Sequence, residues 1–438
     1  MHQNWRPALG GVHAKKATTI AKEVARRCSV RTNIYKALAS EQSCSPETAI
    51  RWQASSVAGG DASVALLSFQ MQACFPGEGW DMIAHEYLAR AIAAYGRTTP
   101  NISLFGGAAG LALIVSVAQQ GDQRYASLRH DLDGYLVASI PRFIEHNSRL
   151  SGLYTTSFDA ISGVAGVCAY ITNTSRAAAS SDMVAAVGSA LMYLLSLANV
   201  QSSNGLYCYI ANDRIPMPDR KLLYPDGYAD TGLAHGVAGV VAALALALLD
   251  GWSAAGLEEG LAQLAGWLVE KQIKDRYGAN WSTFLTSPAK DAHGSRAAWC
   301  YGVPGIARAL YLAGTALGNE ALQGEALAAM GGLIARPRET WGIASPNVCH
   351  GLSGIMQVVL RMYHDTGASQ LRQLIEMLAD EIFSLYSPDT IFGFQDKNVL
   401  GQWYDNPRLL EGAPGVALAL LAASQPVAPK WDRLLLLS

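Results

Sequence analysis

The amino-acid sequence predicts an all-α fold built from repeated pairs of helices. A tetrapeptide of the form G-x-x-G returns six times, at intervals of about 50 to 70 residues, and an apolar segment of helical length follows each copy. Half of the residues are hydrophobic, and many of them are Ala and Leu, which favour helix over strand. The chain has 438 residues, more than the roughly 250–300 at which one hydrophobic core stops growing, unless it grows by repetition.

The glycine pairs predict where one helix of each repeat begins, because glycine permits a tight turn and a close backbone approach. The six copies start at Gly107, Gly163, Gly236, Gly302, Gly351 and Gly412. Each repeat has room for a returning helix, such as the amphipathic segment 254–271. Six or seven such pairs form an open solenoid or close into a ring. Closure would bring together the residues that directly precede the six turns, which are Gly106, Ser162, His235, Tyr301, His350 and Glu411. Several of these residues are polar.

The repeats organise the chain as a single domain over residues 1–438. Residues 1–100 carry no G-x-x-G and are expected to supply leading helices, while residues 101–420 hold the repeats. Residues 200–230 are rich in Pro, Asn, Asp and Tyr, so they predict an irregular or strand-containing insertion.

Charge and hydropathy exclude several classes of protein. The formal net charge is −2 and no block of Lys and Arg stands out, so nucleic acid is not an expected partner. The N-terminal residues lack the apolar core of a signal peptide. The most apolar run, Val237 to Leu249, is shorter than the roughly 20 residues of a membrane span and predicts a buried helix. A cytoplasmic protein that is not an integral membrane protein is expected.

Two of the seven cysteines stand at equivalent points of neighbouring repeats. Cys300 and Cys349 each lie two residues before the first glycine of a turn, and His350 follows Cys349 directly. Zinc prefers thiolate and imidazole ligands, and a catalytic zinc keeps a fourth position open. The spacing therefore predicts one Zn²⁺ held by Cys300, Cys349 and His350. The number of cysteines is odd and their density is low, which argues against a disulfide framework, so the other five are expected to be structural.

These motifs resemble the lanthionine synthetase C family, the lantibiotic cyclases. The resemblance covers about residues 100–420 and lies in AHGVAG (234–239), RAAWCYGVPG (296–305) and CHGLSG (349–354), with support from FDAISGVAG (158–166) and LEGAPG (410–415). It implies an α/α toroid, a double ring of six to seven helix pairs with one zinc ion, in some members with a small strand-containing insertion.

The resemblance also implies an activity and its partners. Enzymes of this family add cysteine thiols of a precursor peptide to dehydroalanine and dehydrobutyrine, which closes lanthionine and methyllanthionine rings. The length is similar to that of the stand-alone class I cyclases. The implied substrate is a dehydrated precursor peptide with leader and core. A complex with a dehydratase and a transporter would hold the protein at the membrane.

Four further residues match the family position by position. The resemblance implies that His235 is the general acid or base, since imidazole titrates near neutral pH. Asp159 would orient or charge-balance His235. Arg296 would stabilise the enolate as a fixed cation, and Tyr301 would donate a hydrogen bond to the enolate or the amide.

Two alternative interpretations stay open at this point. A zinc toroid of another kind, such as a protein prenyltransferase-like enzyme, also alkylates thiols, but that family uses Asp, Cys and His as ligands. A non-catalytic, cyclase-like protein that binds a peptide or glutathione is the second alternative. Loss of His235 or Arg296 would favour it, and this sequence retains both.

Overall fold

The computed structural model describes residues 5–40, 51–119, 123–203, 205–287, 293–398 and 400–438. The chain divides into two compact units. The first unit comprises Met1–Pro100, Leu113–Tyr125 and Gly342–Asp432, and the second comprises Asn101–Ala112, Ala126–Trp341 and Arg433–Ser438. Helix α6 (Ala108–Ala118) is divided between them.

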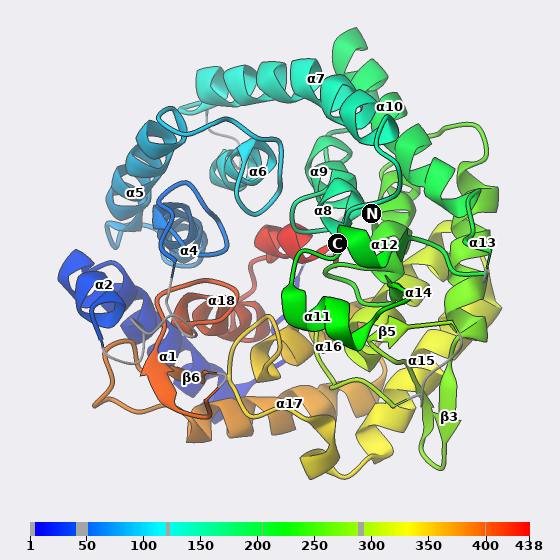
Figure 1. Cartoon of the computed structure of the whole chain (residues 1–438). Helices are drawn as coiled ribbons and strands as arrows, with labels where there is room; N and C mark the ends of the chain where they lie inside the picture. The colour runs from blue at the N-terminus through cyan, green and yellow to red at the C-terminus, as the bar shows by residue number, and fades with distance from the viewer. Residues whose placement is uncertain (1–4, 41–50, 120–122, 204, 288–292, 399) are drawn as a thin grey trace. The chain divides into compact units, whose positions relative to one another are not determined.

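The second unit is a set of helix pairs. Buried helices α9 (Val164–Ile171), α12 (Val237–Leu249) and α14 (Val303–Ala316) alternate along the chain with more exposed helices α7 (Ala126–Ser148), α10 (Ser181–Ala198), α13 (Leu257–Glu270) and α15 (Glu320–Ala335). In Figure 1, α9, α12 and α14 lie next to one another, with α10, α13 and α15 packed outside them. The short helix α8 (Thr155–Phe158) precedes α9.

Burial explains why the two kinds of helix differ in sequence. Every residue of α12 from Val237 to Ala247 is buried, so this helix is apolar on all sides. Helix α13 buries only one face, which includes Leu261, Leu264 and Leu268, and presents its charged residues to solvent. The apolar run at 237–249 is therefore a buried helix, as predicted.

The first unit repeats the pattern with other segments. Its buried helices are α4 (Asp61–Cys74), α16 (Leu352–Thr366) and α18 (Ala413–Ser424), and its outer helices are α1 (Gly11–Cys28), α5 (Trp80–Tyr95) and α17 (Ser369–Ser384), with the short α2 (Arg31–Leu38) after α1. Helix α18 packs against α1, α4 and α16, so the first and last parts of this unit's chain share one core.

In the described part of the chain, three small antiparallel sheets interrupt the helix pairs. One has the order β1–β2–β5, from Tyr209–Ile210, Tyr228–Asp230 and Phe284–Leu285. The others pair β3 (Ile273–Asp275) with β4 (Gly278–Asn280) and β6 (Gln395–Lys397) with β7 (Trp403–Asp405). Helix α11 (Pro218–Leu223) lies between β1 and β2, so the predicted insertion at 200–230 holds two strands, while β5 lies beyond it.

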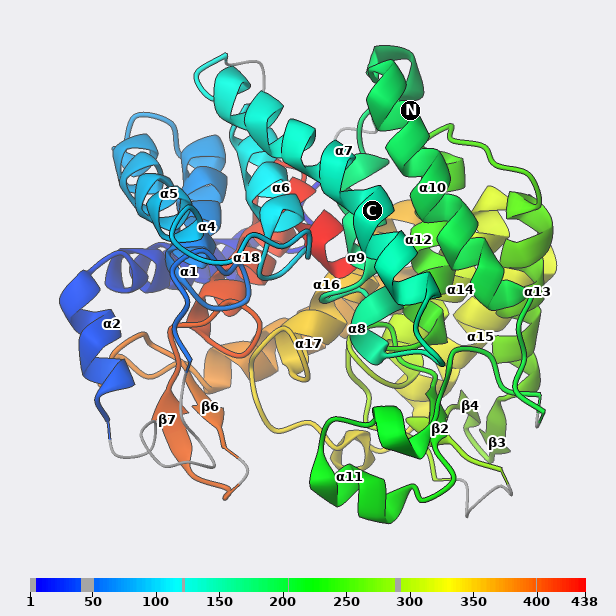
Figure 2. The same cartoon turned by 45° about the horizontal axis from the view of Figure 1, so that its top comes forward.

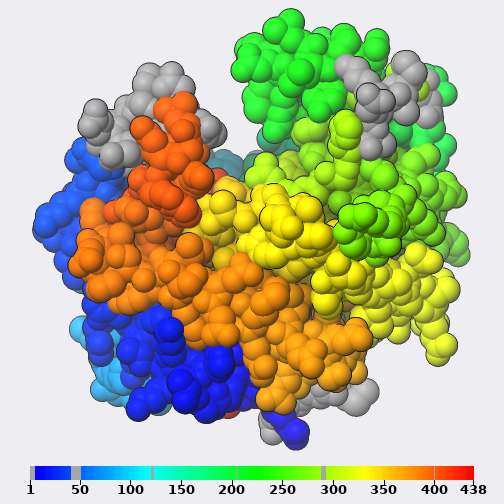
Figure 3. Space-filling view, turned by 90° about the horizontal axis from the view of Figure 1, so that it is seen from below, coloured from blue at the N-terminus to red at the C-terminus, as the bar shows by residue number. Residues whose placement is uncertain are grey.

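In the second unit, α11 and the strands gather at one end of the helices, as Figure 2 shows. The segment around α11, bright green in Figure 3, and the β6–β7 hairpin, orange in the same view, each project from their own unit.

Backbone hydrogen bonds join successive glycine turns. In the second unit, Phe105 N–H donates to the Ile161 carbonyl (3.2 Å), Ala160 N–H to Ala234 (3.1 Å) and Leu233 N–H to Cys300 (2.9 Å). In the first unit, Cys349 N–H donates to Leu410 (2.8 Å) and Leu409 N–H to Ala58 (2.9 Å). Each acceptor lies two residues before the first glycine of the next turn, so equivalent positions of neighbouring repeats are adjacent.

The hydrogen bond from Leu409 N–H to the Ala58 carbonyl shows a further turn of the repeated kind, which has no G-x-x-G sequence. Ala58 lies two residues before Gly60, and α4 begins at Asp61, as the other buried helices begin after their first glycine. Residues 1–100 therefore supply a turn and a buried helix of the repeated kind as well as leading helices.

Candidate functional site

A buried carboxylate orients a histidine in the second unit. His235 Nδ1–H donates to Asp159 Oδ2 at 2.7 Å, and Asp159 is 1% exposed. Asp159 follows α8 and also accepts the N–H groups of Ser162 and Gly163 at 2.7 and 2.8 Å. His235 stands just before α12 and is 38% exposed, so the ring is fixed on one side and open to solvent on the other.

The surroundings of His235 favour its protonated form. Burial alone would lower its pKa, but the hydrogen bond and charge of Asp159, with smaller effects of Asp230 and Cys300, outweigh burial and raise the pKa. The imidazole can therefore hold a proton near neutral pH and release it to a bound reactant.

A second buried carboxylate, Asp230, lies on β2 near the same histidine. It accepts the Gly232 N–H at 2.7 Å and the Tyr301 hydroxyl at 3.3 Å. Burial raises the pKa of Asp230 to about 6, against the lowering effect of nearby His235.

Tyr301 connects this cluster to an aromatic wall. Its ring centroid lies 6.4 Å from that of His235 and 6.2 Å from that of Phe284, which packs 4.5 Å from Tyr228. Burial, followed by the charge of Asp230, raises the pKa of Tyr301 well above its usual value. The hydroxyl therefore stays protonated at any physiological pH and remains a hydrogen-bond donor.

The other two predicted residues of this unit differ in exposure. Cys300 is buried, and its carbonyl accepts the N–H groups of Leu233 and Ala234, which places it beside the His235 turn. Arg296 is exposed. Among the described residues, no hydrogen bond or ion pair joins its side chain to Asp159, His235 or Tyr301, so its predicted role stays a prediction.

The first unit holds Cys349 and His350, both half-buried, at the turn before α16. Asn347 accepts the His350 N–H at 2.9 Å, and its amide nitrogen lies 3.2 Å from His350 Nε2. The same amide donates to buried Asp396 of β6 at 2.9 Å, and Tyr404 of β7 donates to that carboxylate at 3.3 Å. The hairpin thus fixes the imidazole through Asn347.

The predicted zinc ligands are divided between the units. Cys300 belongs to the second unit, and Cys349 and His350 belong to the first. Within the described part of the chain, no three His, Cys, Asp or Glu side chains are grouped closely enough to hold a metal ion. The chemistry of the donors, two thiols and one imidazole fixed by Asn347, fits zinc.

Sequence reasoning missed three residues of these clusters. Asp230 reaches Tyr301 only because β2 carries it there, yet it stands six residues before Gly236 in the DTGLAHG segment. Asn347 stands three residues before His350, a spacing at which an Asx side chain commonly bonds the backbone. Asp396 lies far from any glycine turn in sequence and offered no local signal.

Comparison with known proteins agrees with these observations. The family model for lanthionine synthetase C-like protein matches residues 51–436. The nisin biosynthesis protein NisC of Lactococcus lactis subsp. lactis is 26% identical over 280 residues, 62% of this chain and 64% of that protein. The alignment therefore spans less than two thirds of that relative's length.

The fold agrees with a solved structure. The structure named nisin cyclase aligns with a TM-score of 0.76 and 22% identity, over 89% of this chain and 93% of that chain. This likeness confirms the predicted fold class, the α/α toroid. Because the family model matches most of the sequence, the chain belongs to the lanthionine synthetase C-like family.

Proposed function

We propose that this protein is a zinc-dependent lanthipeptide cyclase. It joins cysteine thiols of a dehydrated precursor peptide to dehydroalanine and dehydrobutyrine of the same peptide. Family membership and the relatives named for nisin biosynthesis and nisin cyclase support the proposal. The observation that carries it is the 2.7 Å pair of buried Asp159 and half-exposed His235, which lies beside the turn of Cys300.

The proposed ligands of the zinc ion are Cys300, Cys349 and His350. When bound, zinc would supply the means of holding the peptide's sulfur as a thiolate, because coordination lowers the pKa of a thiol. The support is the donor set and its position, since both cysteines lie two residues before the first glycine of a turn. Asn347 and Asp396 keep the His350 ring in place.

Residues of the chain itself are proposed to supply the proton and to stabilise the negative charge that the addition requires. Attack of sulfur on the β-carbon places negative charge on the amide oxygen, and the α-carbon then needs a proton. Protonated His235, held by Asp159, delivers that proton from its exposed side. The Tyr301 hydroxyl, which donates to Asp230 before the peptide binds, turns to donate to the charged oxygen, and Arg296 adds a fixed positive charge.

The proposed substrate is a precursor peptide with leader and core. A dehydratase must act before this enzyme, because the acceptor double bonds arise from Ser and Thr. We propose a cytoplasmic location, with a complex of dehydratase and transporter at the membrane. Among the described helices α10 alone is long and apolar enough for a span, and 56% of it is buried inside the protein, as a core helix would be.

The experiment measures ring closure by thiol alkylation. Closure leaves the peptide's mass unchanged, whereas N-ethylmaleimide adds mass to each cysteine that has not reacted. Cys349→Ala is expected to lose zinc, measured by elemental analysis, and ring formation together. Cys74→Ala, the same change in the first unit at a half-buried cysteine, should keep both. Wild-type cyclisation by Cys349→Ala would refute the zinc proposal.

The general acid is tested separately. His235→Ala should keep zinc and slow cyclisation by about 10²–10⁴-fold. His146→Ala, at an exposed position in the same unit, should leave the rate unchanged. Loss of zinc in His235→Ala would make His235 a ligand instead.

The two alternative functions predict different products. A non-catalytic peptide-binding protein would bind the dehydrated peptide and leave all of its thiols open to alkylation. A prenyltransferase-like enzyme would raise the peptide's mass by an added alkyl group. Protection of the thiols without a change of mass is expected only from the cyclase.

A further inference from the structure

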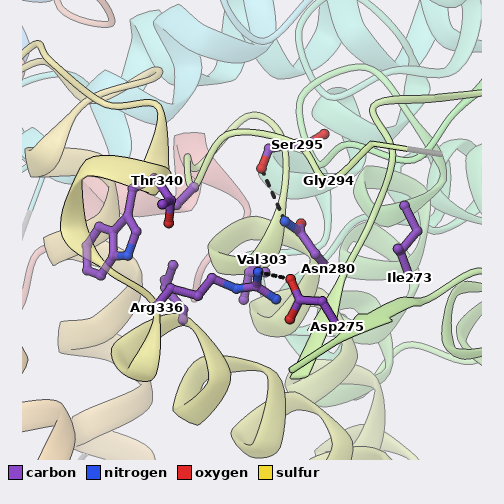
Figure 4. A pocket seen from close by; sticks show the side chains of 11 residues that line it. Ile273, Asp275, Asn280, Gly294, Ser295, Val303, Arg336 and Thr340 are labelled. Atoms are coloured by element: carbon purple, nitrogen blue, oxygen red, sulfur yellow. Dashed lines mark hydrogen bonds and ion pairs between the residues drawn. The ribbon is translucent and has the colours of Figure 1, made fainter. Parts of the chain in front are cut away.

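A cavity of about 200 Å³ lies in the second unit, away from His235 along the chain. It is partly open to solvent and is lined by residues of β3 and β4, the segment before α14, the end of α15 and the turn Arg338–Trp341 (Figure 4). Its lining comprises Ile273, Asp275, Asn280, Gly294, Ser295, Ala297, Val303, Leu333, Arg336, Thr340 and Trp341. Drug-sized ligands occupy roughly 300–1,000 Å³, so this cavity suits a smaller group.

Two buried N–H donors in the lining lack acceptors. Trp341 is 2% exposed, and its Nε1 makes no hydrogen bond in the described structure. The Arg336 side chain is 11% exposed, and its Nε likewise has no acceptor there. Buried donors in proteins are nearly always satisfied, so a pair of unsatisfied ones in a single cavity indicates a missing acceptor.

The other two nitrogen atoms of the Arg336 guanidinium already have partners. Its Nη1 pairs with Asp275, and its Nη2 donates to the Gly278 carbonyl at 3.2 Å. Asp275 also accepts the N–H groups of Tyr277 and Gly278, at 2.8 and 3.2 Å. The carboxylate of Asp275 therefore already accepts hydrogen bonds from Arg336 and from two backbone N–H groups.

The charge and shape around the donors select a kind of acceptor. A second guanidinium, that of Arg338, lies 5.1 Å from the centre of the Trp341 ring. The lining also includes the aliphatic residues Ile273, Val303 and Leu333, and Val303 lies beside the pair of Arg336 and Asp275 in Figure 4. The lining thus combines the Arg336 guanidinium, which is paired with Asp275, and two N–H groups without acceptors in the described structure with aliphatic carbon.

We propose that this cavity binds a carboxylate that carries a short aliphatic chain. Trp341 Nε1–H and Arg336 Nε–H donate to the carboxylate oxygens, and the aliphatic chain packs on Val303 and Leu333. Charge-assisted hydrogen bonds to a carboxylate are roughly twice as strong as those to a neutral carbonyl. The carboxylate of a small free acid and the C-terminal carboxylate of a peptide share this chemistry.

The test uses butanoate and its neutral analogue butanamide. Each is titrated into the full-length protein labelled with ¹⁵N at its tryptophans, at constant ionic strength, and the indole N–H signals are followed by NMR. The chain has ten tryptophans, and Trp341→Phe identifies the signal of interest. A saturable shift of the Trp341 signal with butanoate, and none with butanamide at the same concentrations, is expected. No shift with butanoate, or equal binding of butanamide, would overturn the proposal.

Variants test the two donors. Trp341→Phe keeps the aromatic packing but removes Nε1–H, and it should weaken butanoate binding about tenfold by calorimetry. Arg336→Lys keeps the positive charge but lacks the Nε donor, and should weaken binding similarly. Trp403→Phe, at an exposed tryptophan of the first unit, is the matched control and should bind as the wild type does. Unchanged affinity in both cavity variants, with far-ultraviolet circular dichroism showing them folded, would contradict the proposed contacts.

A peptide arm identifies the source of the carboxylate. The tripeptide Ala-Ala-Val with a free C-terminus is compared with its C-terminal amide and with butanoate. Displacement of butanoate by the free peptide alone assigns the cavity to peptide C-termini. Failure of both peptides, with butanoate bound, assigns it to small free acids. These binding readouts are independent of cyclisation, so they stand or fall separately from the proposed enzyme activity.

Discussion

Asp159 is the residue on which the His235 site depends most. It is almost fully buried and accepts three hydrogen bonds, from His235 Nδ1 and from the N–H groups of Ser162 and Gly163. The two backbone donors belong to the turn before α9, while His235 belongs to the turn before α12. One carboxylate therefore fixes both the local turn and the imidazole of the neighbouring repeat.

Asp159→Asn should cost both stability and activity. An amide offers one acceptor oxygen and no charge, so at least one of the three charge-assisted bonds is lost. We expect the free energy of unfolding to fall by about 1.5–3 kcal/mol, measured by urea denaturation, and cyclisation to slow. Asp131→Asn, at an exposed position of α7, is the matched control. Equal stability of the two variants would show that the Asp159 bonds are not important to the fold.

His364 offers a test of pH dependence away from the site. It stacks on Trp5 with ring centroids 3.6 Å apart, and burial, followed by the charge of Arg361, lowers its pKa below 6.5. Nearby Asp365 and Asp432 act in the opposite direction. The unfolded chain has the ordinary histidine pKa of about 6.5, and the folded chain has a lower one. At a pH between these two values the unfolded chain binds a proton that the folded chain does not, so stability is lost as pH falls below about 6.5.

His364→Phe should remove this dependence while keeping the ring stack. We expect the thermal midpoint of the wild type to fall more than that of the variant between pH 7.5 and 5.5, measured by calorimetry. His146→Phe, at an exposed histidine, should follow the wild type. Parallel curves for His364→Phe and wild type would show that the pKa of His364 is not lowered in the folded state.

At the scale of elements, a close contact fixes the second glycine in four of the six G-x-x-G copies, at Gly166, Gly239, Gly305 and Gly415. A Cβ at Gly239 would lie 2.4 Å from the Leu233 carbonyl oxygen, and one at Gly305 would lie 2.1 Å from that of Trp299. No carbon atom fits at such a distance from an oxygen. These glycines therefore let α9, α12, α14 and α18 start against the loop that precedes each of them.

Gly239→Ala and Gly266→Ala form a matched pair within the second unit. Both glycines are helical, and alanine favours a helix interior by about 0.5–1 kcal/mol. Gly266 has open space around a Cβ, so Gly266→Ala should stabilise by that amount. Gly239→Ala must displace backbone and should destabilise by about 1–3 kcal/mol in chemical denaturation. Stabilisation by both changes would mean that the α12 turn adapts freely.

The glycine pattern explains what the sequence could predict about the fold. Six turns were recognised because two glycines recur where each buried helix starts, and in four of them a Cβ on the second glycine would meet a carbonyl oxygen. The turn at Gly60 escaped recognition because Ser63 stands where the second glycine would be, and its hydroxyl donates to the Gly60 carbonyl at 2.7 Å. Recognition of the turns also made His235 and Cys300 candidate site residues, because each stands just before the first glycine of a turn.

The rest of the site could not be predicted because pairing across the chain creates it. Asp230 meets Tyr301 only through β2, whose partners β1 and β5 lie about 20 and 55 residues away in sequence. Asp396 reaches Asn347 from a hairpin placed between α17 and α18. Such contacts have no signal in periodicity or local motifs.

At the scale of the whole molecule, both units are assembled from distant parts of the chain. The second unit takes its last segment from Arg433–Ser438. Leu434 to Leu437 are fully buried there, and the Leu435 carbonyl accepts Trp299 Nε1–H at 2.9 Å. The Leu437 carbonyl accepts Arg308 Nε–H at 3.0 Å.

Changes in this segment should lower the free energy of unfolding strongly. Leu435→Ala is expected to cost about 2–5 kcal/mol of unfolding free energy, because it leaves a cavity in the core. Leu222→Ala, at an 83% exposed leucine of α11, should change it by at most about 0.5 kcal/mol. A chain ending at Asp432 should lose the near-ultraviolet circular dichroism of its buried tryptophans. Native stability of that truncated chain would refute the assigned role of the segment.

The late position of this segment has a consequence for protein synthesis. After the ribosome has added Trp341, it still has to add roughly 90 residues before it reaches Leu434 to Leu437. At 5–20 residues per second this takes roughly 5–20 seconds. During that interval the indole of Trp299 has no carbonyl to bind, and the apolar surface that receives the leucines stays uncovered. The nascent chain is thus exposed to aggregation until Leu434 to Leu437 emerge, and a chaperone that shields this surface during translation should raise the yield of folded protein.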